Sequence, residues 1–137
     1  MPFLDDNKVT VEGPTATGTT TIDSAAYDMS GFDEITFIVR LGTPAANNNI
    51  RAQQDTASGM GAAADLAGTL VNSATLSQHM VTIRRPLEQF IRCRVTRGTS
   101  TTIDGITVVQ TKARRLPVTQ PATSVAETWT SPAEGTA

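Results

Sequence analysis

Alternation of apolar and polar residues along the chain predicts a protein built from short β-strands. The clearest run is EITFIVRL, residues 34–41, in which every second residue from Ile35 to Leu41 is apolar. A period of two is typical of a strand with one buried face. Shorter alternating runs are KVTVE (8–12), TTTID (19–23), NIRAQQD (49–55), HMVTIRR (79–85), QFIRCRVTR (89–97) and ITVVQTKA (106–113). We therefore expect seven or eight strands.

The segments between these runs contain residues that favour turns, and the whole pattern predicts an all-β protein. Threonine is frequent, and its branched β-carbon suits a pleated sheet. Short strands with regular turn signals in a chain of 137 residues indicate a single-domain β-sandwich, for which a jelly roll is the expected form. One segment differs, since residues 59–68, GMGAAADLAG, would tolerate a short helical turn. The turn signals are Gly13-Pro14, Ser30-Gly31, Gly42-Thr43-Pro44, Ser58-Gly59 and Gly98.

The alternating pattern ends at Arg115, which divides the chain into a domain and a tail. We expect a β-sandwich over residues 1–115, with residues 1–7 as an N-terminal extension, and an extended C-terminal arm over residues 116–137. The arm has three prolines and few large apolar residues, so it should gain order only by lying on another surface. Trp129, the only tryptophan, would then dock either on its own chain or on a neighbouring subunit.

Residues that could support catalysis are scarce. The chain has one cysteine, Cys93, which alternates with apolar residues and is interpreted as part of the core. The single histidine, His79, is interpreted as a structural or exposed residue, and a Cys–His pair across strands is the enzymatic alternative. The adjacent acids Asp5-Asp6 and Asp33-Glu34 are interpreted as surface residues, because neighbours on a strand point to opposite faces and cannot ligate one metal ion.

The segment GMGAAAD, residues 59–65, has the loose spacing of a dinucleotide-binding loop, but its context does not fit. Such a loop opens a helix, whereas Gly68 would end any helix here at once, and no acid lies between Asp65 and Glu88. The sequence also contains no secretory leader and no apolar run long enough to span a bilayer. We therefore expect no enzymatic activity, no cofactor, no metal and no membrane partner.

Charge is unevenly distributed along the chain. Residues 1–39 contain seven acids and one base, whereas residues 84–115 contain eight bases and two acids, although the net charge of the chain is only −2. Such asymmetry favours contact between complementary surfaces of neighbouring subunits, or contact with an acidic partner.

Arginine supplies nine of the 11 basic residues, and it gathers in the second half of the chain. In FIRCRVT, residues 90–96, Arg92 and Arg94 share a strand face with Phe90, and their planar guanidinium groups suit bidentate contacts with carboxylates. A solvated sheet face is one alternative. Nucleic-acid binding is another, although the aromatic content of 4% leaves few rings for stacking on bases. The hypothesis is a protein interface formed by Arg84, Arg85, Phe90, Arg92, Arg94, Arg114, Arg115 and Trp129.

Several short motifs, in order along the chain, resemble a family of small structural proteins of tailed bacteriophages that decorate or cement the capsid. No single motif is specific, but together they extend over well more than half of the chain, from residue 31 to its last residue, and keep their order. They are GFDEITFIVRLG (31–42), DLAGT (65–69), RP (85–86), VTRGT (95–99), IDG (103–105), ARRLPVT (113–119) and the terminal SPAEGTA.

The resemblance implies a jelly-roll or similar β-sandwich on the outer surface of the virion capsid, made in the host cytoplasm. It implies that many copies bridge subunits of the major capsid protein, with self-association as a dimer or trimer, no direct contact with nucleic acid and no catalytic residues. The alternative function is a receptor- or carbohydrate-binding β-sandwich of a phage particle. The scarcity of aromatic rings, one Trp, one Tyr and four Phe, argues against a sugar site.

Overall fold

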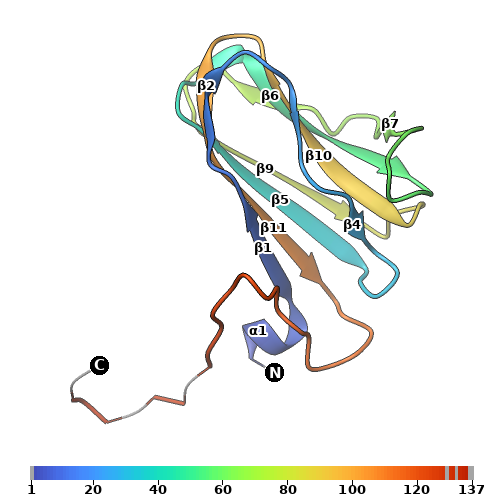
Figure 1. Cartoon of the computed structure of the whole chain (residues 1–137), viewed down its shortest axis with the longest axis vertical. Coiled ribbons are helices and arrows are strands. Elements are labelled where there is room, and N and C mark those ends of the chain that lie inside the picture. Colours follow the sequence, from blue (N-terminus) through green and yellow to red (C-terminus); the bar gives the residue numbers. More distant parts are fainter. Residues whose placement is uncertain (1, 129, 132, 136–137) are drawn as a thin grey trace.

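The computed structural model shows two antiparallel β-sheets packed face to face, with the N-terminal helix and the segment that follows the last strand below the same end of the sandwich (Figure 1). It describes residues 2–128, 130–131 and 133–135. The elements in chain order are α1 (Phe3–Asp6), β1 (Lys8–Glu12), β2 (Thr15–Gly18), β3 (Ile22–Asp23), β4 (Tyr27–Asp28), β5 (Glu34–Leu41), β6 (Ala45–Asp55), β7 (Ala64–Asp65), β8 (Val71–Ser73), β9 (Gln78–Arg84), β10 (Phe90–Arg97) and β11 (Thr101–Thr111).

The strand order is that of a jelly roll. At three sheet edges, two short strands take the place of one and pair with the same neighbouring strand. β1 and β2 pair with β11, β3 and β4 pair with β10, and β7 and β8 pair with β6. When each broken edge is counted as one strand, the described residues form eight strands, and the sheets have the orders 1-8-3-6 and 2-7-4-5. In this numbering strand 1 pairs with strand 8, strand 2 with 7, strand 3 with 6 and strand 4 with 5. This pairing is the double Greek key of a jelly roll. The prediction of an all-β sandwich is therefore confirmed.

The core lies between the sheets, and the alternation in the sequence identifies one of its walls. Ile35, Phe37, Val39 and Leu41 of β5 are fully buried, and Ile50, Ile91, Cys93 and Val95 face them from the other sheet. The Phe37 ring meets the Tyr27 ring edge-on, with centroids 6.1 Å apart and an interplanar angle of 66°. Such edge-to-face contacts add to the free energy gained by burying the rings. The interpretation of Cys93 as a core residue is confirmed.

Two local expectations differ from the structure. Residues 59–68 form turns and the short strand β7, not a helical turn, because the carboxylate of Asp55 accepts hydrogen bonds from the backbone N–H groups of Ala57 and Ala62, at 3.2 and 2.8 Å. The segment thereby folds back over β6 and buries Gln53 and Asp55, which lie on its outer face. In addition, the last strand does not begin after Asp104-Gly105. It starts at Thr101 and passes through a bulge between residues 103 and 105.

The start of the C-terminal arm is attached to the N-terminal residues of the same chain. The side-chain amide of Gln120 donates to the carbonyls of Leu4 and Asn7 at 2.8 and 2.6 Å, and its oxygen accepts from Val9 N–H at 3.0 Å. The backbone N–H of Val118 donates to Asp5 O at 2.8 Å. Beyond this attachment, residues 121–128 lead away from the two sheets (Figure 1).

Candidate interaction surface

Three segments far apart in the sequence meet at one end of the sandwich. They are the β4–β5 loop (29–33), the β9–β10 loop (85–89) and the segment that follows β11 (112–119). Backbone hydrogen bonds join them: Arg85 N–H donates to Asp33 O at 2.7 Å, Met29 N–H to Gln89 O at 2.8 Å, and Arg114 N–H to Gly31 O at 2.9 Å. These bonds hold the three segments in one fixed surface. We call this surface the basic end, and we include in it Arg84, the last residue of β9, which shares Glu34 with Lys112.

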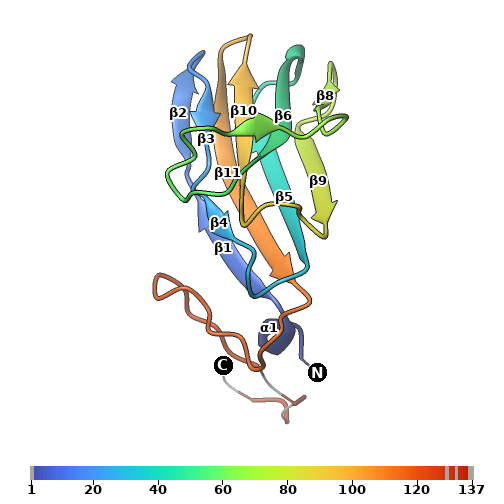
Figure 2. The same ribbon diagram turned by 90° about the vertical axis from the view of Figure 1, so that its right-hand side faces the viewer.

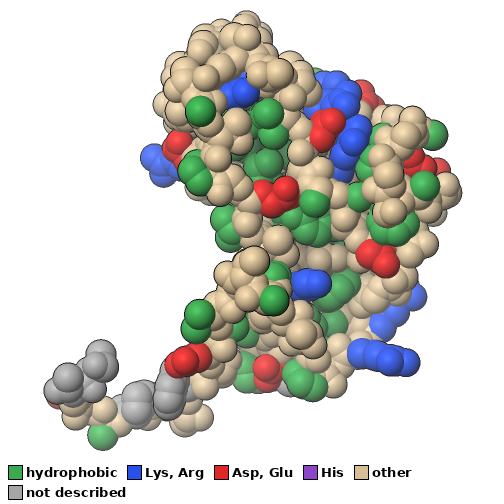
Figure 3. Space-filling view, in the orientation of Figure 1, with side chains coloured by type: hydrophobic (Ala, Val, Ile, Leu, Met, Phe, Trp, Pro, Cys, Tyr) green, Lys and Arg blue, Asp and Glu red, His purple; other side chains and the backbone are tan. Residues whose placement is uncertain are grey.

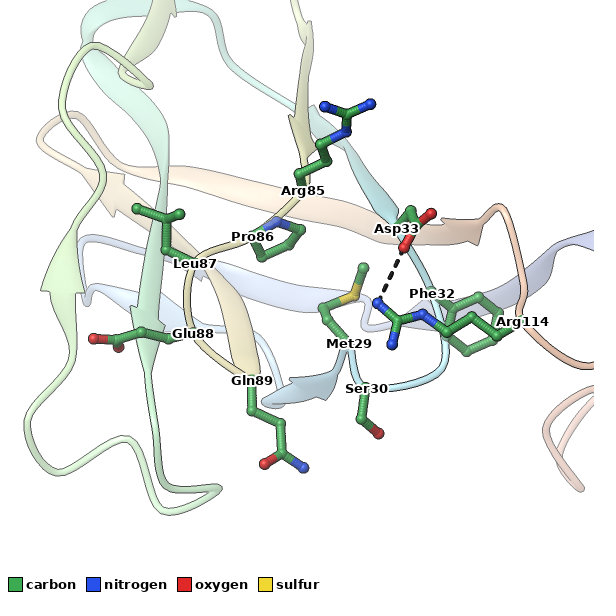
Figure 4. A pocket seen from close by; sticks show the side chains of 10 residues that line it. All are labelled: Met29, Ser30, Phe32, Asp33, Arg85, Pro86, Leu87, Glu88, Gln89 and Arg114. Carbon is green, nitrogen blue, oxygen red and sulfur yellow. Dashed lines mark hydrogen bonds and ion pairs between the residues drawn. The ribbon is translucent and has the colours of Figure 1, made fainter.

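The basic end contains two open hollows of about 540 and 520 Å³. Phe32 and Arg114 line both, and the guanidinium group of Arg114 contacts Asp33 at 3.2 Å over the apolar floor made by Met29 and Phe32 (Figure 4). The first hollow therefore places apolar side chains next to charged ones, a combination that is usual for binding sites. The first is also lined by Ser30, Arg85, Pro86, Leu87, Glu88 and Gln89, and the second by Lys8, Ser30, Gly31, Ala113, Arg115, Pro117, Val118 and Thr119.

The cations of the basic end differ in whether they have an acidic partner. Arg84 and Lys112 both contact Glu34, at 3.0 and 2.7 Å, and the hydrogen bond from Lys112 holds the pKa of Glu34 below its usual range. Arg114 pairs with Asp33. By contrast, Arg85 and Arg115 form no ion pair with any residue in the described part of the chain. These two exposed guanidinium groups are available to an acidic partner.

Two of these cations have unusual backbone conformations. Arg85 and Lys112 have φ values of 49° and 56°, in the left-handed region that residues with a β-carbon seldom adopt. The surrounding loop contacts must stabilise these conformations, and such residues are concentrated at functional sites. The sequence does not predict these left-handed conformations, because neither position is a glycine.

The arginines of β10 lie elsewhere, on the outer face of the other sheet, and they contact acids of their own chain. Arg94 donates from Nε and Nη2 to the two carboxylate oxygens of Asp23, at 2.6 and 2.9 Å. Arg92 donates from Nε to Gln53 at 2.8 Å and approaches Asp23 at 3.5 Å. Their side chains are only 29% and 15% exposed. In the space-filling view, basic and acidic side chains lie next to one another over β6 and β10 (Figure 3).

The structure thus divides the predicted interface into two groups. Arg84, Arg85, Arg114 and Arg115 come together at the basic end. Arg92 and Arg94 form a separate, largely neutralised cluster that joins the edge strand β3 to β10, and Phe90 is half-buried at the start of the same strand. Trp129 lies outside the described residues. Contact of either group with a partner stays a prediction.

The Asp23 cluster gives a testable pH dependence. The hydrogen bond from Arg94 holds the pKa of Asp23 below the usual value of 3.8. The free energy from this pair is therefore fully present above pH 3.8 and is lost as the pH falls through the lower folded value. Asp23→Asn should be about 1 kcal/mol less stable than the natural chain at pH 7, and this difference should shrink below about pH 4.

Urea unfolding of both proteins between pH 3 and pH 7 measures this effect. Asp104→Asn is the matched control. Asp104 forms an exposed ion pair with Arg40 at 3.4 Å and accepts a hydrogen bond from the Thr102 hydroxyl at 3.0 Å, which an asparagine oxygen can also accept, so the loss of its charge should cost little. A difference for Asp23→Asn that is the same at all pH values would contradict the assignment.

Arg97 is a structural arginine that sequence reasoning did not find. It is 3% exposed, and its guanidinium group donates to the carbonyls of Thr20, Ala16 and Thr101 at 2.8, 2.8 and 2.9 Å. Its only signal in the sequence is its place on the inward side of the alternation in β10, next to Ile91, Cys93 and Val95. This position calls for an apolar residue, so a charged residue there needs buried partners.

Cys93 and His79 are both buried, but they lie in different sheets, on β10 and β9. Burial raises the pKa of the Cys93 thiol to about 12, so the reactive thiolate is suppressed near neutral pH. The ring nitrogens of His79 have no hydrogen-bond partner among the described residues. The described residues also contain no group of three or more His, Cys, Asp or Glu side chains placed to hold a metal ion, and no helix long and apolar enough to cross a membrane.

Comparisons with known proteins show a likeness of fold. No family model matches the sequence, and no curated protein sequence matches it. The PBSX exported protein XepA aligns with 89% of this chain at 11% identity and a TM-score of 0.53. The SPBc2 prophage-derived protein YomS aligns with 76% of this chain and 93% of its own length, at 9% identity and a TM-score of 0.48. This chain covers 43% of the length of XepA, and at such identity the likeness concerns the fold alone.

Proposed function

We propose that this protein is a structural component of a bacteriophage particle, which decorates the outer surface of the capsid and stabilises it by bridging subunits of the major capsid protein. One observation carries the proposal: parts of three of the motifs that resemble phage decoration proteins lie together on one surface. Gly31 to Asp33, the Arg85-Pro86 pair and all of residues 113–119 except Leu116 line the two hollows of the basic end, although they are far apart in the sequence.

The charges of the basic end support contact with an acidic protein surface. Arg85 and Arg115 are exposed, and no acid in the described part of the chain neutralises them. An acidic partner would therefore gain two ion pairs without breaking an existing one. The apolar side chains of Met29 and Phe32, which line the first hollow, would add contact area near these charges.

The C-terminal arm would extend this contact surface. It leaves the sandwich next to the second hollow, where Pro117 and Val118 are part of the lining. A sandwich that contacts one capsid subunit and an arm that reaches the next would together form a bridge. Because many copies bind one shell, modest contacts of each copy would add up to strong attachment.

Cosedimentation with capsids of the parent phage that lack this protein tests the proposal. We expect saturable binding that weakens as the salt concentration rises. Arg85→Glu and Arg115→Glu should each weaken binding about tenfold at low salt. Arg40→Glu is the matched control, because Arg40 is also an exposed arginine but lies at the opposite end of β5.

Two results would count against the proposal at different levels. No binding of the natural chain at any salt concentration would remove capsid decoration. If Arg85→Glu and Arg115→Glu bind capsids as well as the natural chain does, capsid decoration stays supported. The basic end would then not be the contact surface. Circular dichroism of each variant establishes that a loss of binding is not a loss of folding.

A further inference from the structure

Strand β9 forms a free edge of its sheet, and among the described residues it is the longest edge strand. It has seven residues and pairs only with β5. Figure 2 shows it along one side of the molecule. An edge strand of this length carries a row of backbone groups without partners, which is a template for pairing with another strand.

The hydrogen bonds at the two ends of the β5–β9 ladder show which backbone groups of β9 point outward. Leu41 N–H donates to Ser77 O at 2.9 Å, and Arg85 N–H donates to Asp33 O at 2.7 Å. Because hydrogen-bonded pairs in an antiparallel ladder recur at every second residue, residues 79, 81 and 83 also bond to β5. The N–H and C=O groups of Gln78, Met80, Thr82 and Arg84 therefore point away from the sheet.

The other edges of the sandwich are shortened, interrupted or covered. β3, β4, β7 and β8 have two or three residues each. The edge made of β1 and β2 is interrupted at Pro14, and the outward N–H of Val9 is already bonded to Gln120 of the arm. Such features protect an edge against pairing with another chain. β9 has none of them.

Exposed apolar side chains lie along the same edge. Met80 in the middle of β9 is 55% exposed, Leu76 in the preceding turn is 66% exposed, and Leu87 in the following loop is 90% exposed. Large apolar residues on both flanks of an unpaired strand indicate a contact surface that the single chain leaves open.

We propose that two copies of this chain associate through β9, with the two strands antiparallel and related by a two-fold axis at Val81. This register pairs all four outward-facing residues of each strand: Gln78 lies opposite Arg84 of the second copy, and Met80 lies opposite Thr82. It also brings the turn with Leu76 next to the loop with Leu87 of the second copy, so that both leucines lose exposure. The inference does not depend on the proposed function.

A second copy fits this edge because the pairing is self-complementary. Arg84, the only charged residue on β9, meets the neutral amide of Gln78 and not a second cation. No like charges lie opposite each other, which would oppose the contact. A two-fold axis also gives a closed association that uses the same edge of both copies, so it leaves no free β9 on which a fibre could grow.

Sedimentation equilibrium of the full chain from low to high micromolar concentration tests the proposal. We expect a mass that rises toward twice 14.5 kDa. Met80→Pro removes an outward-facing N–H that has no partner on β5, so it should leave the fold intact and raise the dissociation constant at least about tenfold. Met80→Lys, which places a cation near Arg84, should act in the same direction.

Val11→Pro is the matched control. Val11 is exposed on edge strand β1 of the same sheet, and its N–H also points outward because it follows Val9 by two residues. This variant should associate like the natural chain. Thermal unfolding establishes that each variant is folded.

Disulfide formation tests the register. When Met80→Cys and Thr82→Cys proteins are mixed under mild oxidation, mixed dimers should form faster than either protein forms dimers alone, and the buried Cys93 should not react. A natural chain that stays monomeric over the whole range would overturn the proposal. A dimer that Met80→Pro leaves intact would overturn it as well.

Discussion

Replacing Phe37 by alanine is expected to lower the free energy of unfolding by about 4 kcal/mol. Phe37 is fully buried in the middle of β5 and contacts Tyr27 edge-on. The smaller side chain loses the free energy of burying the ring and leaves a cavity that the two sheets cannot fill, because both are fixed by their ladders. Urea unfolding followed by circular dichroism measures the change as a lower midpoint at an unchanged slope.

Two further variants identify the cause of the Phe37 effect. Phe37→Leu fills most of the space and should cost about 1 kcal/mol. Phe3→Ala removes an aromatic ring that is 58% exposed on α1, and its effect should be within about 0.5 kcal/mol of zero. If Phe37→Ala destabilised the protein no more than Phe3→Ala, the packing between the sheets would differ from the one described.

Replacing Arg97 by methionine is expected to lower the free energy of unfolding by about 3 kcal/mol. Methionine has a similar length, so the change removes the buried guanidinium group and leaves the carbonyls of Ala16, Thr20 and Thr101 without their donors. Buried acceptors without partners are costly, since water bonds to them in the unfolded chain. Residues 16–20, which comprise the end of β2 and the start of the turn to β3, should also lose protection from hydrogen exchange.

Arg97→Lys distinguishes the loss of charge from the loss of geometry. Lysine keeps the positive charge, but it lacks the planar fork that reaches three carbonyls from one position. We expect a loss of stability between those of the natural chain and Arg97→Met. Equal stability of Arg97→Met and the natural chain would show that these carbonyls find other donors and that Arg97 does not hold the segment in place.

The two groups of arginines show why the sequence alone does not reveal which arginines are paired with acids of the same chain. The sequence shows nine arginines against two lysines and a clear gradient of charge. However, Arg94 and Asp23 lie 71 residues apart, and Arg114 and Asp33 lie 81 apart. Whether such groups meet depends on which strands become neighbours and in what register. A surface charge can be counted in the sequence, but its partner is visible only after the sheets have formed.

The sequence by itself determined the fold class and most of the core. A period of two places every second side chain on one face, so the alternation from Ile35 to Leu41 specifies a buried wall before any partner strand is known. Cys93 could be assigned to the core for the same reason. These properties are local, because they depend only on neighbouring residues.

The tertiary structure decided which residues come together. It placed Arg85 and Arg115 at one end of the sandwich without acidic partners among the described residues, and it buried Arg97 among carbonyls of its own chain. It also turned alternate N–H groups of β9 outward, which follows from the register with β5 and not from the residues of β9. Pairing between strands acts over long separations in the chain, and so the candidate sites depend on the topology that local patterns do not encode.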